Sequence, residues 1–209
     1  MNLQTQRWQL PGPVGVIEAM RDAPLAGEAV RGVAVVAHPH PLFGGTMENK
    51  VVQTMARAFV QCGWVAVRFN FRGVGASAGQ HDEGRGELED MLAVIRQTAD
   101  ADGPLALAGF SFGSFIAVSA VERLWPSRPA EKIVLVGTAT SRFKVLALPP
   151  PAHERTLVVH GEQDDTVPLA AVMDWARPQA LPVTVVPGGG HFFHGQLPLL
   201  KSLLVRHLR

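Results

Sequence analysis

The chain has 209 residues, of which 47% are hydrophobic and 18% are charged, and its formal net charge is +1. So small a charge gives no electrostatic basis for binding nucleic acid or an anionic surface, and no basic run with interleaved aromatic residues is present. No apolar stretch is long enough to cross a bilayer, and the first residues lack the pattern of a signal peptide. We therefore expect a cytoplasmic protein with a single domain over 1–209 and with neither a nucleic-acid nor a membrane partner.

Apolar runs of strand length alternate with helical patterns along the chain. The predicted strands are Val14–Ala19, Gly32–Ala37, Val65–Phe69, Leu105–Ala108, Ile133–Val136, Thr156–His160 and Val183–Val186. The predicted helices are Glu48–Gln61, Glu87–Ala99, Phe112–Leu124, Leu169–Ala176 and Leu197–Leu208. This alternation is typical of an α/β fold, in which a mainly parallel, twisted sheet carries helices on both faces. The hairpin-like start of the chain is expected to add antiparallel strands at one edge.

A serine stands between two glycines where a predicted strand meets a predicted helix, in the segment Gly109-Phe110-Ser111-Phe112-Gly113. A turn that sharp brings neighbouring backbones close to the serine, and glycine removes the side chains that would collide. Gly-x-Ser-x-Gly in this context is typical of a nucleophile elbow, which exposes the serine oxygen above the sheet. A serine hydroxyl is a weak nucleophile alone, so this interpretation requires a base and a group that orients the base.

Acidic residues and histidines follow two later predicted strands. Asp164 and Asp165 come after Thr156–His160. We favour Asp164 as the functional acid because it begins Asp-x-x-Val-Pro at the offset from His160-Gly161 seen in serine hydrolases of this architecture, whereas Asp165 is expected to cap the next helix. His191 follows three glycines on the loop after Val183–Val186, and it is a better candidate base than His194, for which a surface position is expected. Ser111, Asp164 and His191 occur in the order of the α/β-hydrolase triad, in which histidine takes the serine proton and aspartate holds its tautomer.

An oxyanion formed at Ser111 would need two backbone donors. Phe112 offers an N–H at the start of a helix, where the dipole also favours negative charge. The second donor is expected in the segment HPHPLFGG, where Pro39 and Pro41 have no N–H. We therefore predict the amide of His40, with Leu42 as the alternative.

Two motifs favour other chemistries, and each lacks its context. The segment 73–78, GVGASA, fits the dinucleotide-binding fingerprint after a strand, yet polar loop follows it where a helix is required. We interpret it as a tight turn beside the site, with Arg72 bound to nearby carbonyls or carboxylates. His38 and His40 could begin a metal cluster, but both are fenced by prolines and no Asp-His pair follows, so neither a metal nor another cofactor is predicted. The one cysteine, Cys62, is expected to be a core thiol.

Three segments resemble a small, lid-less bacterial group of the α/β-hydrolase superfamily: HPHPLFGGTMENKVV, FRGVGAS and HFFHG. The resemblance extends from about His38 to Gly195 and implies a hydrolase of esters or related acyl bonds, without implying a particular substrate. A site without a cap is expected to be open and shallow, which favours a small-molecule ester or acyl substrate, or an ester exposed on a larger molecule. Many relatives carry a helical cap after the sixth core strand, whereas Gly137–Arg155 is too short for more than a turn or short helix. Its apolar residues are either buried or line an acyl pocket. Ester, thioester and peptide hydrolysis stay open, as do a non-catalytic binding role and the oligomeric state.

Overall fold

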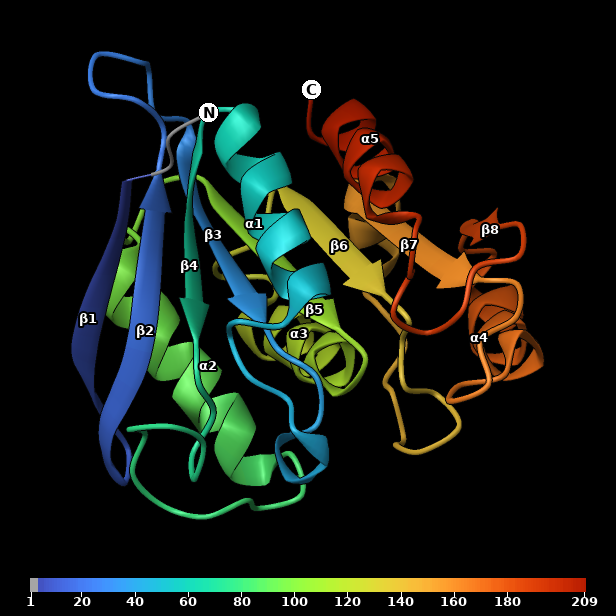
Figure 1. Ribbon diagram of the computed structural model, residues 1–209, viewed down its shortest axis with the longest axis horizontal. Helices are drawn as coiled ribbons and strands as arrows, with labels where there is room; N and C mark the ends of the chain where they lie inside the picture. The colour runs from blue at the N-terminus through green and yellow to red at the C-terminus, as the bar shows by residue number, and fades with distance from the viewer. Residues whose placement is uncertain (1–3) are drawn as a thin grey trace.

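Eight strands form one sheet in the computed structural model, which describes residues 4–209 (Figure 1). The strands are β1 (Gln4–Gly12), β2 (Gly15–Ala23), β3 (Gly32–Ala37), β4 (Trp64–Phe69), β5 (Leu105–Phe110), β6 (Lys132–Val136), β7 (Thr156–Gly161) and β8 (Val183–Val186). The helices are α1 (Lys50–Gln61), α2 (Arg85–Thr98), α3 (Phe112–Leu124), α4 (Leu169–Ala176) and α5 (Leu197–Leu208), with short 3₁₀ turns at Pro41–Phe43, Pro150–Arg155 and Arg177–Gln179. The strand order across the sheet is β1-β2-β4-β3-β5-β6-β7-β8.

The sheet is parallel from β4 to β8 and antiparallel at one edge. β1 and β2 form a hairpin, and β2 pairs antiparallel with β4, so its arrowhead in Figure 1 points opposite to those of β3 and β4. The predicted fold class is therefore confirmed. The sequence indicated a hairpin without placing β1, because most of its side chains are exposed and it carries no apolar run.

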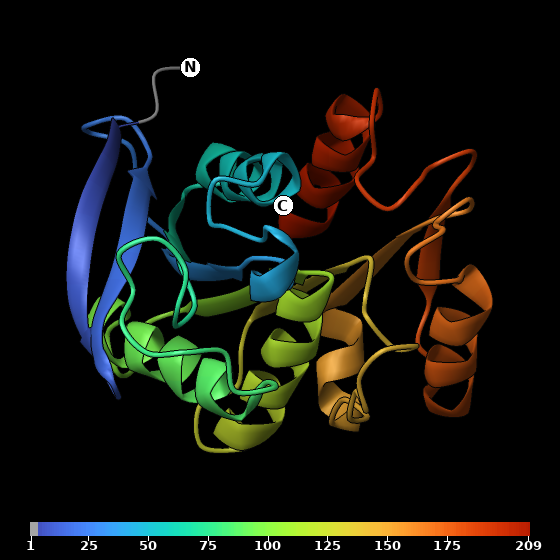
Figure 2. The same cartoon turned by 60° about the horizontal axis from the view of Figure 1, so that its bottom comes forward.

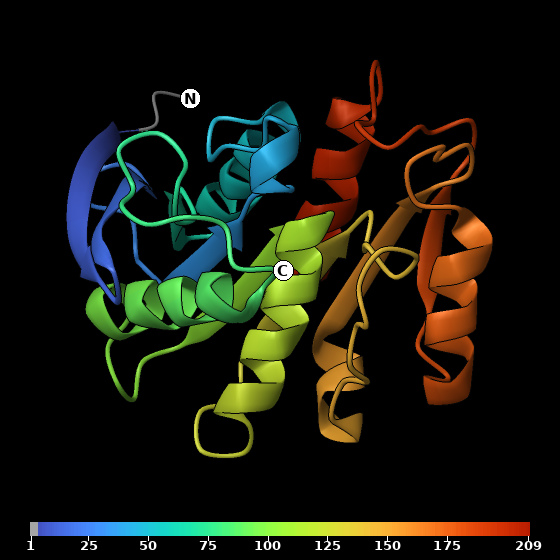
Figure 3. The same ribbon diagram turned by 90° about the horizontal axis from the view of Figure 1, so that it is seen from below.

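Helices cover both faces of this sheet, with α1 and α5 on one side and α2 and α3 on the other (Figures 2 and 3). Each central strand supplies alternate residues to the two cores. In β5, Leu105 and Leu107 pack beneath α2 and α3, whereas Ala106 and Ala108 pack beneath α1 and α5. Burial on both faces explains why the parallel strands read as continuous apolar runs.

Local capping explains where two helices begin. α1 starts at Lys50, two residues after the predicted start, because the Asn49 side chain accepts a hydrogen bond from the Val51 amide at 2.9 Å. α2 starts at Arg85, where the buried Glu87 carboxylate accepts from the Gly84 amide at 2.8 Å. Cys62, at the C-cap of α1, is half-buried and packs against the hydrophobic core, so the expected core thiol lies at the margin of the core.

The order of the strands creates a crevice at the carboxyl ends of β3 and β5. From β3 the chain continues to β4 on one side, and it then crosses to β5 on the other side. Ligands of open α/β sheets bind at such a topological switch point. The segments that carry His40 and Ser111 leave β3 and β5 at this point, and those that carry Asp164 and His191 leave β7 and β8 at the same edge.

Candidate active site

Ser111 occupies the sharp turn between β5 and α3, with φ of 56° and ψ of −117°. A side chain in this backbone region costs on the order of 1–3 kcal/mol, which the surrounding structure must offset. The Ser111 amide donates to the carbonyl of Val136 on β6 at 2.8 Å. A Cβ atom at Gly109 would collide with the backbone of Gly113, and one at Gly113 would collide with the Ala37 carbonyl. The two glycines therefore permit the close packing that holds the turn.

Ser114 braces the same turn and was not identified from the sequence. Its side chain is buried, and its hydroxyl lies 2.7 Å from the Gly109 carbonyl oxygen and 3.0 Å from that of Val136. The Val136 carbonyl thus meets both the Ser111 amide and the Ser114 hydroxyl. A serine inside an apolar helical pattern gives no sequence signal of this role, which appears only when β5 and β6 are paired.

The structure brings Ser111, Asp164 and His191 together in one buried cluster. His191 Nε2 lies 3.0 Å from Ser111 Oγ, and His191 Nδ1 lies 2.7 Å from Asp164 Oδ2. All three side chains are buried. Nδ1 facing the carboxylate is the protonated nitrogen, so Nε2 is free to accept the serine proton.

Asp164 is held as a carboxylate by the turn in which it lies. Its Oδ1 accepts from the amides of Thr166 at 3.0 Å and Val167 at 2.7 Å, while Oδ2 faces His191. Burial by itself would raise the pKa of Asp164, but the hydrogen bonds from His191 and Val167 outweigh it and hold that pKa below its ordinary value. The carboxylate is therefore charged at neutral pH.

A second histidine, His160, also contacts this carboxylate and was not identified as a site residue. His160 is fully buried at the end of β7, and its Nε2 lies 2.9 Å from the Val167 carbonyl oxygen and 3.5 Å from Asp164 Oδ2. Burial lowers the pKa of His160, which keeps the ring neutral. The Nε2–H of the neutral ring donates to the Val167 carbonyl and so joins the two ends of the turn 160–167, which contains Asp164.

The loops that carry Asp164 and His191 are joined to each other. The Gln163 amide beside Asp164 donates to the Gly189 carbonyl of the His191 loop at 2.8 Å. Gly137, at the end of β6, makes room for the base, since a Cβ there would lie 3.2 Å from His191 Cε1. The imidazole therefore has a fixed position between Asp164 and Ser111.

The rejected alternatives lie at the surface. His194 is exposed, as expected, and Asp165 is exposed as well. Asp165 does not cap α4, so that prediction was wrong. Pro168 occupies the N-cap of α4 without a side-chain hydrogen bond, and the Asp165 carboxylate instead accepts from Thr166 Oγ1 at 3.3 Å.

Both predicted oxyanion donors lie at the same cavity as Ser111. Phe112 is the first residue of α3, and it lines the cavity together with His40. The amide of Leu42, the alternative donor, donates to His40 Nδ1 at 3.2 Å. Since that contact occupies the Leu42 amide, the arrangement favours the amide of His40.

His38 anchors the loop that presents His40. Its Nδ1 donates to the Pro39 carbonyl at 2.6 Å, and its Nε2 accepts from the Phe71 amide at 3.0 Å. Burial is the main cause that lowers the pKa of His38 to about 4, so the ring is neutral. Both nitrogens are engaged, which leaves His38 no lone pair for a metal ion. Across residues 4–209, no three metal-ligating side chains gather in one place.

The glycine-rich segment 73–78 forms a turn that packs against β2, where Glu18 accepts from the Ala76 amide at 3.0 Å, and it does not line the Ser111 cavity. Ser77 Oγ donates to the Asn70 carbonyl at 2.7 Å, and α2 begins only at Arg85, so no helix follows the glycines directly. Arg72 makes two side-chain hydrogen bonds to the buried Asp90 carboxylate, at 3.0 and 2.8 Å. The expectation of a tight turn with Arg72 bound to a carboxylate is confirmed.

A cavity of about 430 Å³ opens beside Ser111. Its volume lies in the range of small-molecule sites. Phe143 lines it, whereas Leu148 from the same segment is buried and Leu146 is exposed, so only part of that segment faces the cavity. The lining residues are His40, Phe43, Ser111, Phe112, Ala139, Arg142, Phe143, Thr166 and Val167.

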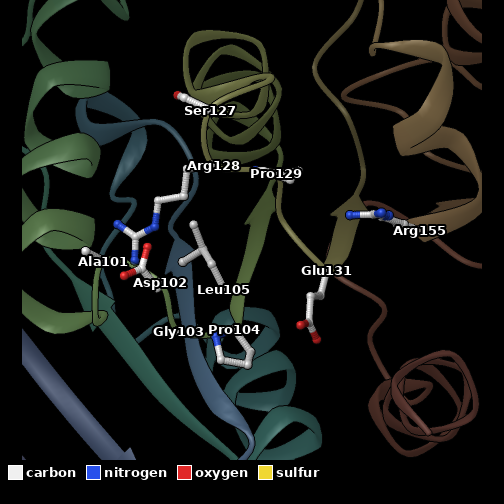
Figure 4. A pocket seen from close by; sticks show the side chains of 10 residues that line it. All are labelled: Ala101, Asp102, Gly103, Pro104, Leu105, Ser127, Arg128, Pro129, Glu131 and Arg155. Atoms are coloured by element: carbon white, nitrogen blue, oxygen red, sulfur yellow. The ribbon is translucent and has the colours of Figure 1, made fainter.

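Another cavity, of about 640 Å³, lies at the amino ends of the parallel strands, at the opposite end of the strands from Ser111 (Figure 4). Arg128 and Asp102 lie on one side of it and Arg155 and Glu131 on the other. Arg128 donates to the Ala99 and Asp100 carbonyls, and Arg155 donates to the Ala130 carbonyl. These arginines brace the loops at the amino ends of the strands, away from Ser111.

Solved structures with this fold include α/β serine hydrolases. A serine hydrolase of this class from Xanthomonas campestris, described as having no lid, is 36% identical, with a TM-score of 0.87 over 100% of this chain and 95% of that one. A homologue from Coxiella burnetii is also 36% identical, with a TM-score of 0.84 over 98% of this chain and 97% of that one.

The chain belongs to the α/β-hydrolase superfamily and, within it, to the family described as serine aminopeptidase, S33, which it matches over residues 29–158. The protein is therefore a hydrolase of the serine type. An uncharacterized protein of Rickettsia prowazekii is 41% identical over 116 residues, which are 54% of this chain and 48% of that protein. The match thus spans about half the length of that relative. Within the described residues, none of the helices could span a membrane.

Proposed function

We propose that the protein hydrolyses a carboxylic ester or a related acyl bond through an acyl-enzyme on Ser111. The observation that carries this proposal is the unbroken chain of contacts from Asp164 through His191 to Ser111, at 2.7 and 3.0 Å. The buried, hydrogen-bonded carboxylate and the fixed imidazole are the features that activate a serine hydroxyl.

In the first half of the reaction, Ser111 Oγ attacks the acyl carbon while its proton moves to His191 Nε2. The negative charge that develops on the acyl oxygen is stabilised by the amides of Phe112 and His40, and the imidazolium is stabilised by Asp164. The tetrahedral intermediate then expels the alcohol, which leaves with the proton from His191. Ser111 retains the acyl group as an ester.

In the second half, water attacks the acyl carbon and gives its proton to His191 Nε2. The bond from the acyl carbon to Ser111 Oγ breaks, and His191 returns the proton to the serine. The products are a carboxylic acid and free enzyme. No cofactor is required by this sequence of steps.

The lining of the cavity favours an acyl ester over an aminopeptidase substrate. An aminopeptidase must hold the positively charged amino terminus of a peptide, for which a carboxylate is the natural partner. The residues that line the Ser111 cavity within the described chain include Arg142 but no aspartate or glutamate. A guanidinium beside the nucleophile would repel an ammonium group.

The proposal is tested by measuring hydrolysis of p-nitrophenyl acetate and butyrate beside leucine p-nitroanilide. We expect ester turnover that is lost in Ser111→Ala and no turnover of the anilide. Faster turnover of the anilide would replace the ester by a peptide substrate. No turnover of either class by a folded protein would favour a non-catalytic binding role.

A further inference from the structure

Arg142 is the one residue with a permanent charge in the lining of the Ser111 cavity, as far as the described chain shows. Aromatic and aliphatic side chains form most of the remaining wall, among them Phe43, Phe143 and Val167. The cavity therefore combines an apolar surface with a single cationic group.

The backbone of Arg142 is held in a tight turn after β6. The amides of Arg142 and Phe143 both donate to the Ala139 carbonyl, at 3.1 and 3.0 Å. The Phe143 ring stacks on Phe115 of α3, with 5.0 Å between centroids and 10° between planes. These contacts fix the backbone position of Arg142, which lines the cavity.

Other arginines near the sheet are already engaged, whereas Arg142 is not. Arg68 and Arg72 pair with buried aspartates, at 2.7 and 2.8 Å. The Arg142 side chain is exposed and makes neither a hydrogen bond nor an ion pair with any part of the chain that the structure describes. Its planar guanidinium thus keeps a full set of donors for a ligand.

A neighbouring cavity of about 670 Å³ is also lined by Arg142 and has a second cationic side chain. It shares His40, Phe43, Arg142 and Phe143 with the Ser111 cavity and adds Lys144. Its one carboxylate, Glu83, lies 4.0 Å from Arg85, which offsets part of its charge. Among the described lining residues, the two cavities together have two cationic side chains, Arg142 and Lys144, and one carboxylate, and Arg142 lines both cavities.

We propose that Arg142 binds an anionic group of the substrate, so that the preferred esters carry a carboxylate or phosphate on the part that fills this cavity. This inference rests on the proposed ester hydrolysis and names the substrate class. A guanidinium can bind either group through two parallel hydrogen bonds, which is the strong form of this contact. The ester bond that Ser111 attacks and the anionic group would lie at opposite ends of one substrate.

The test compares monoethyl adipate with its terminal amide, which has the same shape without the charge, and with ethyl 5-phosphonopentanoate. The quantity measured is the ratio of kcat/KM for each anionic ester to that for the amide. We expect the wild-type ratio for at least one anion to be about tenfold to a hundredfold. A carboxylate subsite favours the adipate, and a phosphate subsite favours the phosphonate.

Arg142→Gln should bring that ratio close to one, and Arg142→Lys should retain part of it. Arg206→Gln, on the exposed face of α5, is the matched control and should leave the ratio unchanged. A ratio near one in the wild-type protein, or the same ratio in the wild type and Arg142→Gln, would overturn the proposal. In that case, Ser111-dependent hydrolysis of the ester bond in the uncharged amide analogue would still uphold the proposed function.

Binding provides a second readout that needs no turnover. Calorimetry on Ser111→Ala should show tighter binding of monoethyl adipate or ethyl 5-phosphonopentanoate than of the amide. The difference should vanish when Arg142→Gln is added and should shrink as salt is raised, since salt screens the charge. Equal binding of the three compounds would refute the anion subsite even if no ester is hydrolysed.

Discussion

Polar side chains have different partners at the two ends of the parallel strands, which we call the carboxyl edge and the amino edge of the sheet. At the carboxyl edge, Ser111, Asp164 and His191 are buried and contact one another. At the amino edge, Arg128 and Arg155 donate to backbone carbonyls around an open cavity. Each edge has a cavity. At the carboxyl edge the polar side chains contact one another, whereas at the amino edge the arginines contact the backbone.

The two edges also differ in the free-energy costs that the surrounding structure must offset. Burying a polar group costs several kcal/mol unless it is hydrogen-bonded, and holding a serine at positive φ costs about 1–3 kcal/mol more. At the carboxyl edge the Ser111 hydroxyl avoids the first cost through its contact with His191, and the hydrogen bond from the Ser111 amide to Val136 helps to offset the second. The arginines of the amino edge satisfy loop carbonyls, so they serve the stability of the fold.

The largest expected effect is loss of the nucleophile. Ser111→Ala should lower kcat for an activated ester by about six orders of magnitude, because the triad acts as a unit. Ser127→Ala, in the cavity of the amino edge, should change kcat by less than roughly twofold. Initial rates with p-nitrophenyl butyrate measure both, and a comparable loss in the two variants would refute the contrast between the edges.

The next effect concerns the acid. Asp164→Asn should lower kcat by about four orders of magnitude, because the amide no longer holds the protonated Nδ1 of His191 toward Ser111. Asp165→Asn makes the same chemical change one residue away on the exposed side and should stay within roughly twofold. Circular dichroism of both variants serves as the folding control. Equal activity of the two variants would mean that Asp164 does not orient the base.

A smaller effect is expected from the packing of the elbow. Gly113→Ala should lower the free energy of unfolding by about 3 kcal/mol or more, since its Cβ would overlap the Ala37 carbonyl and strain the turn. Gly190→Ala is the matched control, because the nearest atom to its Cβ lies at 4.0 Å. Urea unfolding measures both, and a Gly113→Ala protein as stable as wild type would contradict this packing.

The pH dependence of stability tests the loop of His38. The pKa of His38 is about 4 in the fold, below the ordinary 6.5, so the unfolded chain takes up a proton that the folded protein does not as the pH falls from 6.5 towards 4. The contribution is present above pH 6.5, and about 2–3 kcal/mol of it should be lost by pH 4.5.

His38→Gln keeps a donor and an acceptor but removes this titration. Urea unfolding at pH 7.5 and pH 4.5 should therefore show a smaller fall in stability for the variant than for the wild type. Other buried histidines, such as His160, titrate in both proteins and cancel in the comparison. An equal fall in the two proteins would show that His38 does not stay neutral.

The sequence predicted those features that depend on local spacing. Ser111 is a candidate because its flanking glycines coincide with a change from strand to helix period, and Asp164 and His191 are candidates because each follows a strand; the structure brings the three together. Asp165 was misassigned because its residue type suits an N-cap, whereas the path of the chain puts Pro168 there.

Other features depend on contacts between strands and loops that spacing does not encode. His160 reads as the last residue of an apolar strand, and only the fold places its ring at the Val167 carbonyl. Ser114 likewise reads as a helical residue until β6 lies beside it. Arg142 has no motif at all, and its place at the cavity follows from the short connection after β6.

The most direct test of the account is labelling by a fluorophosphonate probe, located by peptide mass spectrometry. We predict a single adduct on Ser111 that is absent from Ser111→Ala and strongly reduced in His191→Ala, because the hydroxyl reacts only when the base is in place. Labelling of Ser111 that persists unchanged in His191→Ala, or no adduct on the folded wild-type protein, would contradict an activated serine at this site.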